Sequence, residues 1–198
     1  MLDLKAMTYS VVDVSNFFID YYSRSVDPVN LARVQMFVYF AQAESLVRTG
    51  EVLFEEEIRA YATGPAVARL NVYYEECGNM PISIHGDFDR AIFDKADRQL
   101  LMDVAIYYNQ FSTSELQIMA YSDKGPWEQV YSQGMELLTI DPAIIRDYYM
   151  DRPGIPRYQR FVTSKVDEAC GRIKTGSDVL QKDPAFVYSN GGFSKTWE

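Results

Sequence analysis

The residues able to perform nucleophilic, acid–base or metal chemistry are few and scattered. The 198-residue chain has one histidine, His85, and two cysteines, Cys77 and Cys170. None of the three stands at the spacing of a zinc site, and a catalytic triad would have to be assembled around His85 alone. Free thiols are the expected state of both cysteines. We therefore expect no metal and no other cofactor.

Neighbouring carboxylates are the remaining candidates for catalysis. Glu75 with Glu76 and Asp87 with Asp89 form such pairs, but a chain with 28 acidic residues contains pairs by chance. The acidic run at 55–57 fits a solvated turn better than a metal cluster. The sequence has no phosphate-binding glycine loop, no nucleophile elbow and no zinc hydrolase or deaminase motif. These observations predict a protein that is not an enzyme.

One apolar stretch, "EIRAYATGPAVARL" (57–70), is interrupted by Gly64 and Pro65. Proline is tolerated in the first turn of a helix, and glycine gives the preceding backbone freedom to turn. No nucleophile or base stands beside the pair. The sequence therefore favours a helix that begins at Gly64-Pro65, and the alternative is an exposed groove formed there with Tyr61.

Hydrophobic periodicity predicts a mostly α fold, a compact multi-helix single domain with at most short extended segments. Ser10 or Thr8 can cap the first helix, and Asn30 and Gly50 are suited to cap the longest one. Asp94 caps a later helix, and Ser112 with Glu115 has the pattern of a capping box. A short extended piece is expected at 81–84. The predicted helices cover residues 9–25, 29–50, 66–78, 93–112, 112–122, 126–134 and 141–151.

Composition and charge narrow the class of protein. Hydrophobic residues make up 47% of the chain, which is enough to build a core, but no apolar run reaches the roughly 18–20 residues that span a bilayer. The first residues lack the layout of a signal peptide, so a cytoplasmic protein without membrane contact is expected. A net charge of −9 disfavours direct binding to nucleic acid and favours a basic protein partner.

The composition changes after Asp151, where a basic, proline-rich stretch begins. We therefore expect a helical domain at 8–151 and a partly irregular C-terminal extension at 152–198. The extension is rich in aromatic residues, Trp197 among them. Two roles remain open for these side chains: they pack onto the domain, or they form a partner surface.

The string at 30–67, "NLARVQMFVYFAQAESLVRTGEVLFEEEIRAYATGPAV", resembles the Panacea domain of SocA-like antitoxins and GepA-type phage-associated proteins. Further on, "SELQIMAYSDKGPW" resembles a later family segment through Leu116, Pro126 and Trp127, and the resemblance extends over about 8–151. The residues that match in the first string are Asn30, Leu31, Gln35, Tyr39, Phe40, Ala41, Gln42, Gly50, Leu53, Phe54, Glu56, Ile58, Ala60, Gly64 and Pro65.

The chain departs from the family pattern at several positions. A lysine pair in the second helix is replaced by Arg33 and Met36, and the tryptophan before Gly-Pro is replaced by Tyr61. A Thr-His pair falls on Ala120 and Tyr121. Any chemical role of that histidine in relatives is therefore lost here.

The resemblance implies an antitoxin that neutralises a cognate protein toxin by direct contact. It also leaves open an adaptor that delivers the toxin to a cellular protease, and a phage accessory protein that binds another host factor. Two of the candidates also have a structural interpretation: Gln42 is suited to hydrogen-bond a turn, and Trp127 is suited to fill the core. Tyr39 and Phe40 are expected to be core residues. The candidate partner-binding residues are Arg33, Gln42, Tyr61, Gly64, Pro65, Tyr121, Trp127 and Trp197.

Overall fold

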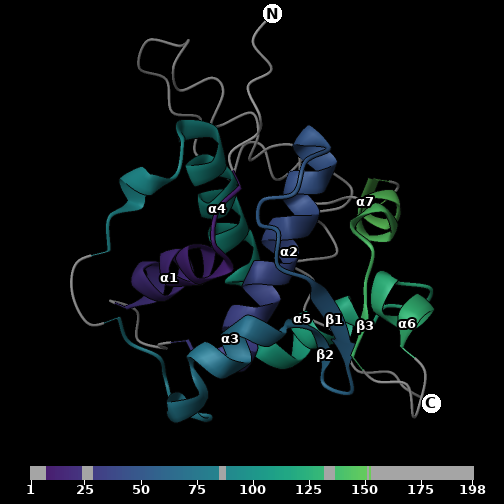
Figure 1. The fold of residues 1–198 in the computed structure, drawn as a ribbon, viewed down its shortest axis with the longest axis horizontal. Helices are drawn as coiled ribbons and strands as arrows, with labels where there is room; N and C mark the ends of the chain where they lie inside the picture. Colours follow the sequence, from purple (N-terminus) through teal and green to yellow (C-terminus); the bar gives the residue numbers. More distant parts are fainter. Residues whose placement is uncertain (1–7, 24–28, 85–87, 132–136, 151, 153–198) are drawn as a thin grey trace, which may run out of the picture. The chain divides into compact units, whose positions relative to one another are not determined.

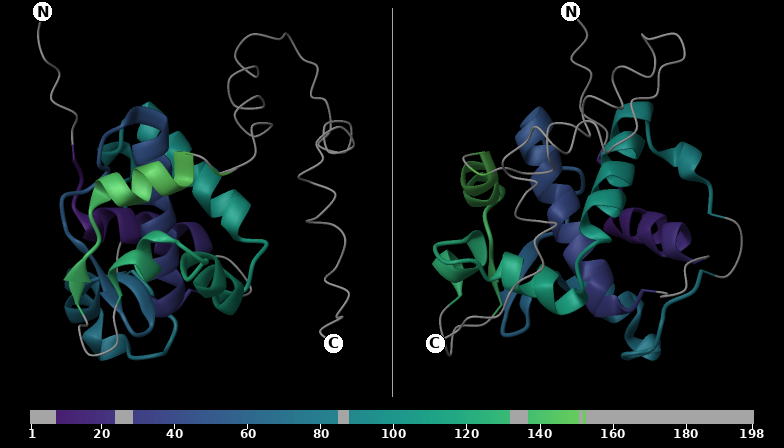
Figure 2. Two further views of the ribbon diagram at one scale, coloured as in Figure 1. Left: turned by 90° about the vertical axis from the view of Figure 1, so that its right-hand side faces the viewer. Right: turned by 180° about the vertical axis from the view of Figure 1, so that it is seen from behind.

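Helix α2 (Leu31–Thr49) lies at the centre of the computed structural model, which describes residues 8–23, 29–84, 88–131, 137–150 and 152 (Figure 1). Figure 2 shows α7 lying across α2. The expected mostly helical fold with short extended segments is confirmed. The helices that pack on α2 are α1 (Val11–Tyr22), α3 (Ala68–Tyr73), α4 (Lys95–Tyr108), α5 (Thr113–Ala120) and α7 (Pro142–Met150).

The surroundings of α2 explain its composition. Every residue from Val34 to Leu46 is buried, so the helix is enclosed on all sides along this stretch. Tyr39 and Phe40 belong to the core, as the sequence favoured. The predicted caps are also confirmed, because the Asn30 side chain accepts a hydrogen bond from the Arg33 amide (3.1 Å) and Gly50 ends the helix with a φ of 79°.

A small antiparallel sheet replaces part of the predicted third helix. Strand β1 (Ile58–Tyr61) pairs with β2 (Gly64–Val67) on one side and with β3 (Leu138–Thr139) on the other. The prediction that Gly64-Pro65 begins a helix is wrong, because α3 starts only at Ala68. Since β2 lies at the sheet edge, the missing N–H of Pro65 breaks no ladder hydrogen bond.

The predicted helix caps and proline starts hold where the structure describes them. Ser10, Asp94 and Ser112 cap α1, α4 and α5, and Glu115 completes the capping box. Proline opens both α6 (Pro126–Val130) and α7. The segment at 81–84 forms no strand, although the Ile82 amide donates to the Val29 carbonyl (2.9 Å). Two short 3-10 turns, η1 (Glu75–Cys77) and η2 (Arg90–Ile92), complete the described elements.

Of the residues first considered for chemistry, His85, Asp87 and Cys170 lie outside the described residues. Glu75 and Glu76 are exposed on η1. Glu56 has a structural role, since its carboxylate pairs with Arg69 (2.8 Å) and accepts from the Val11 amide. Among the described residues, no three His, Cys, Asp or Glu side chains lie together so that they could hold a metal ion.

In the part of the chain that the structure describes, no helix is long and apolar enough to cross a bilayer. Of the extension expected at 152–198, only Arg152 is described. The boundary near residue 152 therefore stays a prediction.

Buried tyrosines make the fold sensitive to high pH, and Tyr74 offers a test. Its hydroxyl donates to Asn16 Oδ1 (2.9 Å), and burial raises its pKa to about 12. An unfolded tyrosine ionises near pH 10, so the stability from Tyr74 is complete below about pH 10 and is lost between about pH 10 and 12. From pH 9 to 11, wild type should lose about 1–2 kcal/mol more unfolding free energy than Tyr74→Phe.

Urea unfolding at a series of pH values measures this difference. Tyr73→Phe is the control, because it removes a tyrosine hydroxyl from a neighbouring residue that is 60% exposed. Equal pH dependence of wild type and Tyr74→Phe would contradict the assignment.

Candidate protein-binding surface at the hairpin

Several residues predicted to contact a partner gather around the β1–β2 hairpin. Tyr61, Gly64 and Pro65 belong to the two strands, and Tyr121 and Trp127 approach from the end of α5 and from α6. Both helices lie beside the hairpin (Figure 1). Residues far apart in the sequence therefore lie close together, with Tyr61, Tyr121 and Trp127 half-buried and Gly64 and Pro65 buried.

Trp127 is the centre of this group. Its indole Nε1 donates to the Tyr61 carbonyl (2.8 Å), and its ring stacks on Tyr131 with centroids 4.4 Å apart. The Tyr121 ring meets the indole edge to face at 4.5 Å. We call Tyr61, Tyr121, Trp127 and Tyr131 the aromatic cluster, and each of the four is half-buried. Trp127 thus packs within the fold while part of the cluster remains exposed to solvent.

Tyr121 closes the cluster over the hairpin turn. Its hydroxyl lies 3.4 Å from the Ala62 carbonyl, to which it donates. Burial raises the pKa of Tyr121, so the phenol stays a neutral donor at neutral pH. Its ring also covers Gly64, where an added Cβ would lie 3.5 Å from the ring carbon Cζ, an ordinary contact distance.

Gly64 carries a backbone constraint that the free space does not remove. Its φ is 116°, a value that residues with a side chain rarely adopt. We expect Gly64→Ala to lower the free energy of unfolding by about 1–2 kcal/mol through backbone strain alone. Thermal and urea unfolding measure the change, with exposed Thr63→Ala in the same turn as a control expected to stay within about 0.5 kcal/mol. Unchanged stability of Gly64→Ala would contradict the strain.

Ile118 extends the aromatic cluster along α5. Its side chain is 68% exposed, and it precedes Tyr121 by three residues, which places both on one side of the helix. We call the aromatic cluster together with Ile118 the hairpin surface. The sequence analysis did not include Ile118 and Tyr131. Helical spacing could have indicated both, because Ile118 lies three residues before Tyr121 and Tyr131 lies four residues after Trp127.

The remaining candidates occupy other positions. Arg33 Nη1 donates to the Phe111 carbonyl (2.8 Å), and the guanidinium lies over the Phe37 ring at 5.1 Å. Gln42 is 3% exposed, and its side chain bonds the backbone of Leu53 and Phe54, the turn-bonding alternative. Trp197 lies outside the described residues. The hairpin surface therefore includes neither these three nor Gly64 and Pro65, which are buried.

Part of the chain is similar to a known protein family. A family model described as "Antitoxin SocA-like, Panacea domain" matches residues 34–128. The matched segment includes α2 from Val34 onward, the β1–β2 hairpin, Ile118, Tyr121 and Trp127, and it ends before Tyr131. No curated protein and no solved structure matches the chain. Residues 34–128 are therefore similar to the Panacea domain of SocA-like antitoxins.

Proposed function

We propose that this protein is a cytoplasmic antitoxin that neutralises a cognate protein toxin by direct binding through the hairpin surface. The family match supports an antitoxin-type role. The observation that carries the proposal is the half-buried aromatic cluster, which lies beside the 68% exposed Ile118. Binding requires no catalytic group, and the described residues offer no evident catalytic constellation.

The aromatic cluster has the physical properties of a binding hot spot. Tryptophan and tyrosine are enriched at the centres of interfaces, where a large ring fills a pocket on the partner. Here the rings are already held by the stacking on Tyr131 and by the Trp127 hydrogen bond to Tyr61. Little side-chain entropy is lost on binding when the rings are ordered beforehand, so more of the contact energy appears as affinity.

Charge and sequence variation suggest how the partner is selected. The net charge of −9 favours a basic toxin, whose approach it accelerates. Tyr121, which replaces the histidine of the family pattern, packs its ring on Trp127, and Tyr61, which replaces the tryptophan, bonds the same indole through its backbone carbonyl. Changing the residues on either side of a shared anchor alters the shape that a partner must match, so these positions are suited to set toxin specificity.

Co-expression with the product of the neighbouring gene tests the proposal. We expect growth rescue together with a stable complex that is recovered by pull-down at moderate salt. Rescue without a complex would overturn neutralisation by binding. The half-life of the toxin, measured with protein synthesis blocked, separates the two mechanisms: it is unchanged or longer for sequestration and shorter for an adaptor that delivers the toxin to a protease.

A further inference from the structure

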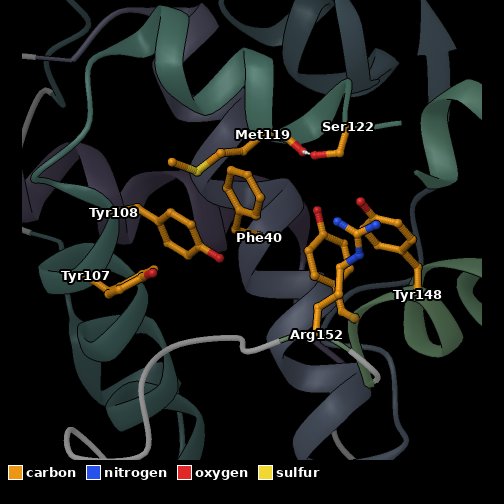
Figure 3. A pocket seen from close by; sticks show the side chains of 8 residues that line it. Phe40, Tyr107, Tyr108, Met119, Ser122, Tyr148 and Arg152 are labelled. Atoms are coloured by element: carbon orange, nitrogen blue, oxygen red, sulfur yellow. Dashed lines mark hydrogen bonds between the residues drawn. The ribbon is translucent and has the colours of Figure 1, made fainter. Parts of the chain in front are cut away.

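A pocket lies between α2, α4, α5 and the end of α7, apart from the aromatic cluster. Figure 3 shows Phe40, Met119 and Tyr108 on one side of it, with Tyr148 and Arg152 on the other. Its volume is about 140 Å³, and Tyr149 also lines it. An engineered apolar cavity of about 150 Å³ binds benzene, so this pocket has room for one aromatic ring.

Two polar groups at the pocket lack partners. The Tyr148 and Tyr149 hydroxyls are shut off from solvent, and neither makes a well-formed hydrogen bond with a residue that the structure describes. Such groups are rare in folded proteins, and each costs about 1–3 kcal/mol when left unsatisfied. The nearby Tyr39 hydroxyl still interacts with Tyr149 and lowers its pKa against the larger effect of burial. Burial raises the pKa of Tyr149, so its phenol keeps its proton and can donate a hydrogen bond to an anion.

Arg152 supplies a positive charge at the same place. Its guanidinium stacks over the Tyr148 ring at 4.0 Å and makes no ion pair within the described part of the chain. The Arg152 residue is exposed, so its side chain has room to move aside and uncover the hydroxyls beneath it. A guanidinium with free donors binds a carboxylate through two parallel hydrogen bonds.

We propose that this pocket binds a small aromatic carboxylate. The ring would occupy the space beside Phe40 and Met119, where edge contacts with an aromatic ring and a thioether are favourable. The carboxylate would pair with Arg152 and accept a hydrogen bond from Tyr149, which removes the cost of the unpartnered hydroxyl. This inference does not depend on the proposed toxin contact, because none of the pocket residues belongs to the hairpin surface.

Benzoate is the probe, titrated into the full-length protein and followed by ligand-observed NMR and calorimetry. For a ligand of this size we expect a Kd on the order of 1 mM. Benzamide keeps the ring without the charge, and acetate keeps the charge without the ring. Both should bind at least about tenfold more weakly, because each lacks one of the two recognition elements.

Variants locate the site. Arg152→Gln should weaken benzoate binding at least about tenfold, and Tyr149→Phe severalfold. Arg146→Gln on α7 should leave the Kd unchanged, because the half-exposed Arg146 pairs with Asp147 and does not line the pocket. Far-UV circular dichroism verifies that each variant is folded. Equal affinity for benzoate and benzamide, wild-type affinity in Arg152→Gln, or no binding at about tenfold above the expected Kd would each overturn the proposal.

Discussion

Ile118→Arg is expected to weaken the complex with the toxin at least about a hundredfold and to abolish growth rescue. Burying an isoleucine side chain contributes about 1.5–3 kcal/mol, and a hundredfold loss corresponds to about 2.7 kcal/mol. The substitution removes this contact and also places an uncompensated charge in the interface, against a partner that we expect to be basic. Calorimetry or surface plasmon resonance with purified toxin measures the loss.

The fold should tolerate this substitution. Ile118 is 68% exposed on α5, and arginine is a good helix former, so the melting temperature should be unchanged. Ile106→Arg is a matched control, because Ile106 is an isoleucine on α4 with 50% exposure that lies outside the hairpin surface. Equal binding by wild type and Ile118→Arg would place the toxin contact elsewhere. Loss of binding by both Ile118→Arg and Ile106→Arg would show that the effect is not specific to the hairpin surface.

Gln42→Leu is expected to lower the free energy of unfolding by about 3–5 kcal/mol. The Gln42 Oε1 accepts from the amides of Leu53 (2.9 Å) and Phe54 (3.3 Å), and Nε2 donates to the Phe54 carbonyl (3.1 Å). Leucine has a similar size but no polar atoms, so three backbone groups in the core lose their partner. Each buried group left unsatisfied costs about 1–3 kcal/mol. Urea unfolding measures the loss.

A glutamine on the surface provides the comparison. Gln110 is exposed after α4 and donates to the Tyr107 carbonyl (2.9 Å), where water can replace it. Gln110→Leu should therefore change the stability by less than about 0.5 kcal/mol. If toxin affinity per folded molecule falls in Gln42→Leu, the residue also acts on the partner surface. A stability loss similar to that of Gln110→Leu would refute the proposed role of Gln42.

Gln35 has the same role as Gln42, because its buried side chain also bonds backbone groups outside α2. It is 5% exposed, and it accepts from the Val67 amide (2.9 Å) and donates to the Val67 carbonyl (3.0 Å). The two glutamines are seven residues apart, about two helical turns, so α2 holds both the connector before β1 and the end of β2. Periodicity places these residues on α2, but it does not reveal which backbone groups they bond.

Local signals in the chain were enough to predict where most helices begin. Ser10, Asn30, Asp94 and Ser112 each cap a helix by accepting from an amide two or three residues ahead. These bonds depend on few neighbouring residues, so their pattern is visible in the sequence. The family resemblance was visible in the same way, through the order of residues from Asn30 to Pro65.

The β1–β2–β3 sheet and the hairpin surface depend on contacts between distant parts of the chain. Gly64-Pro65 reads locally as a helix start, but pairing of Ala60 with Pro65 and Leu138 makes its surroundings a sheet edge. Trp127 likewise meets Tyr61 across 66 residues. Periodicity reports which residues are apolar within one element, whereas these arrangements are set by the packing of several elements around α2, which the order of residues along one segment does not encode.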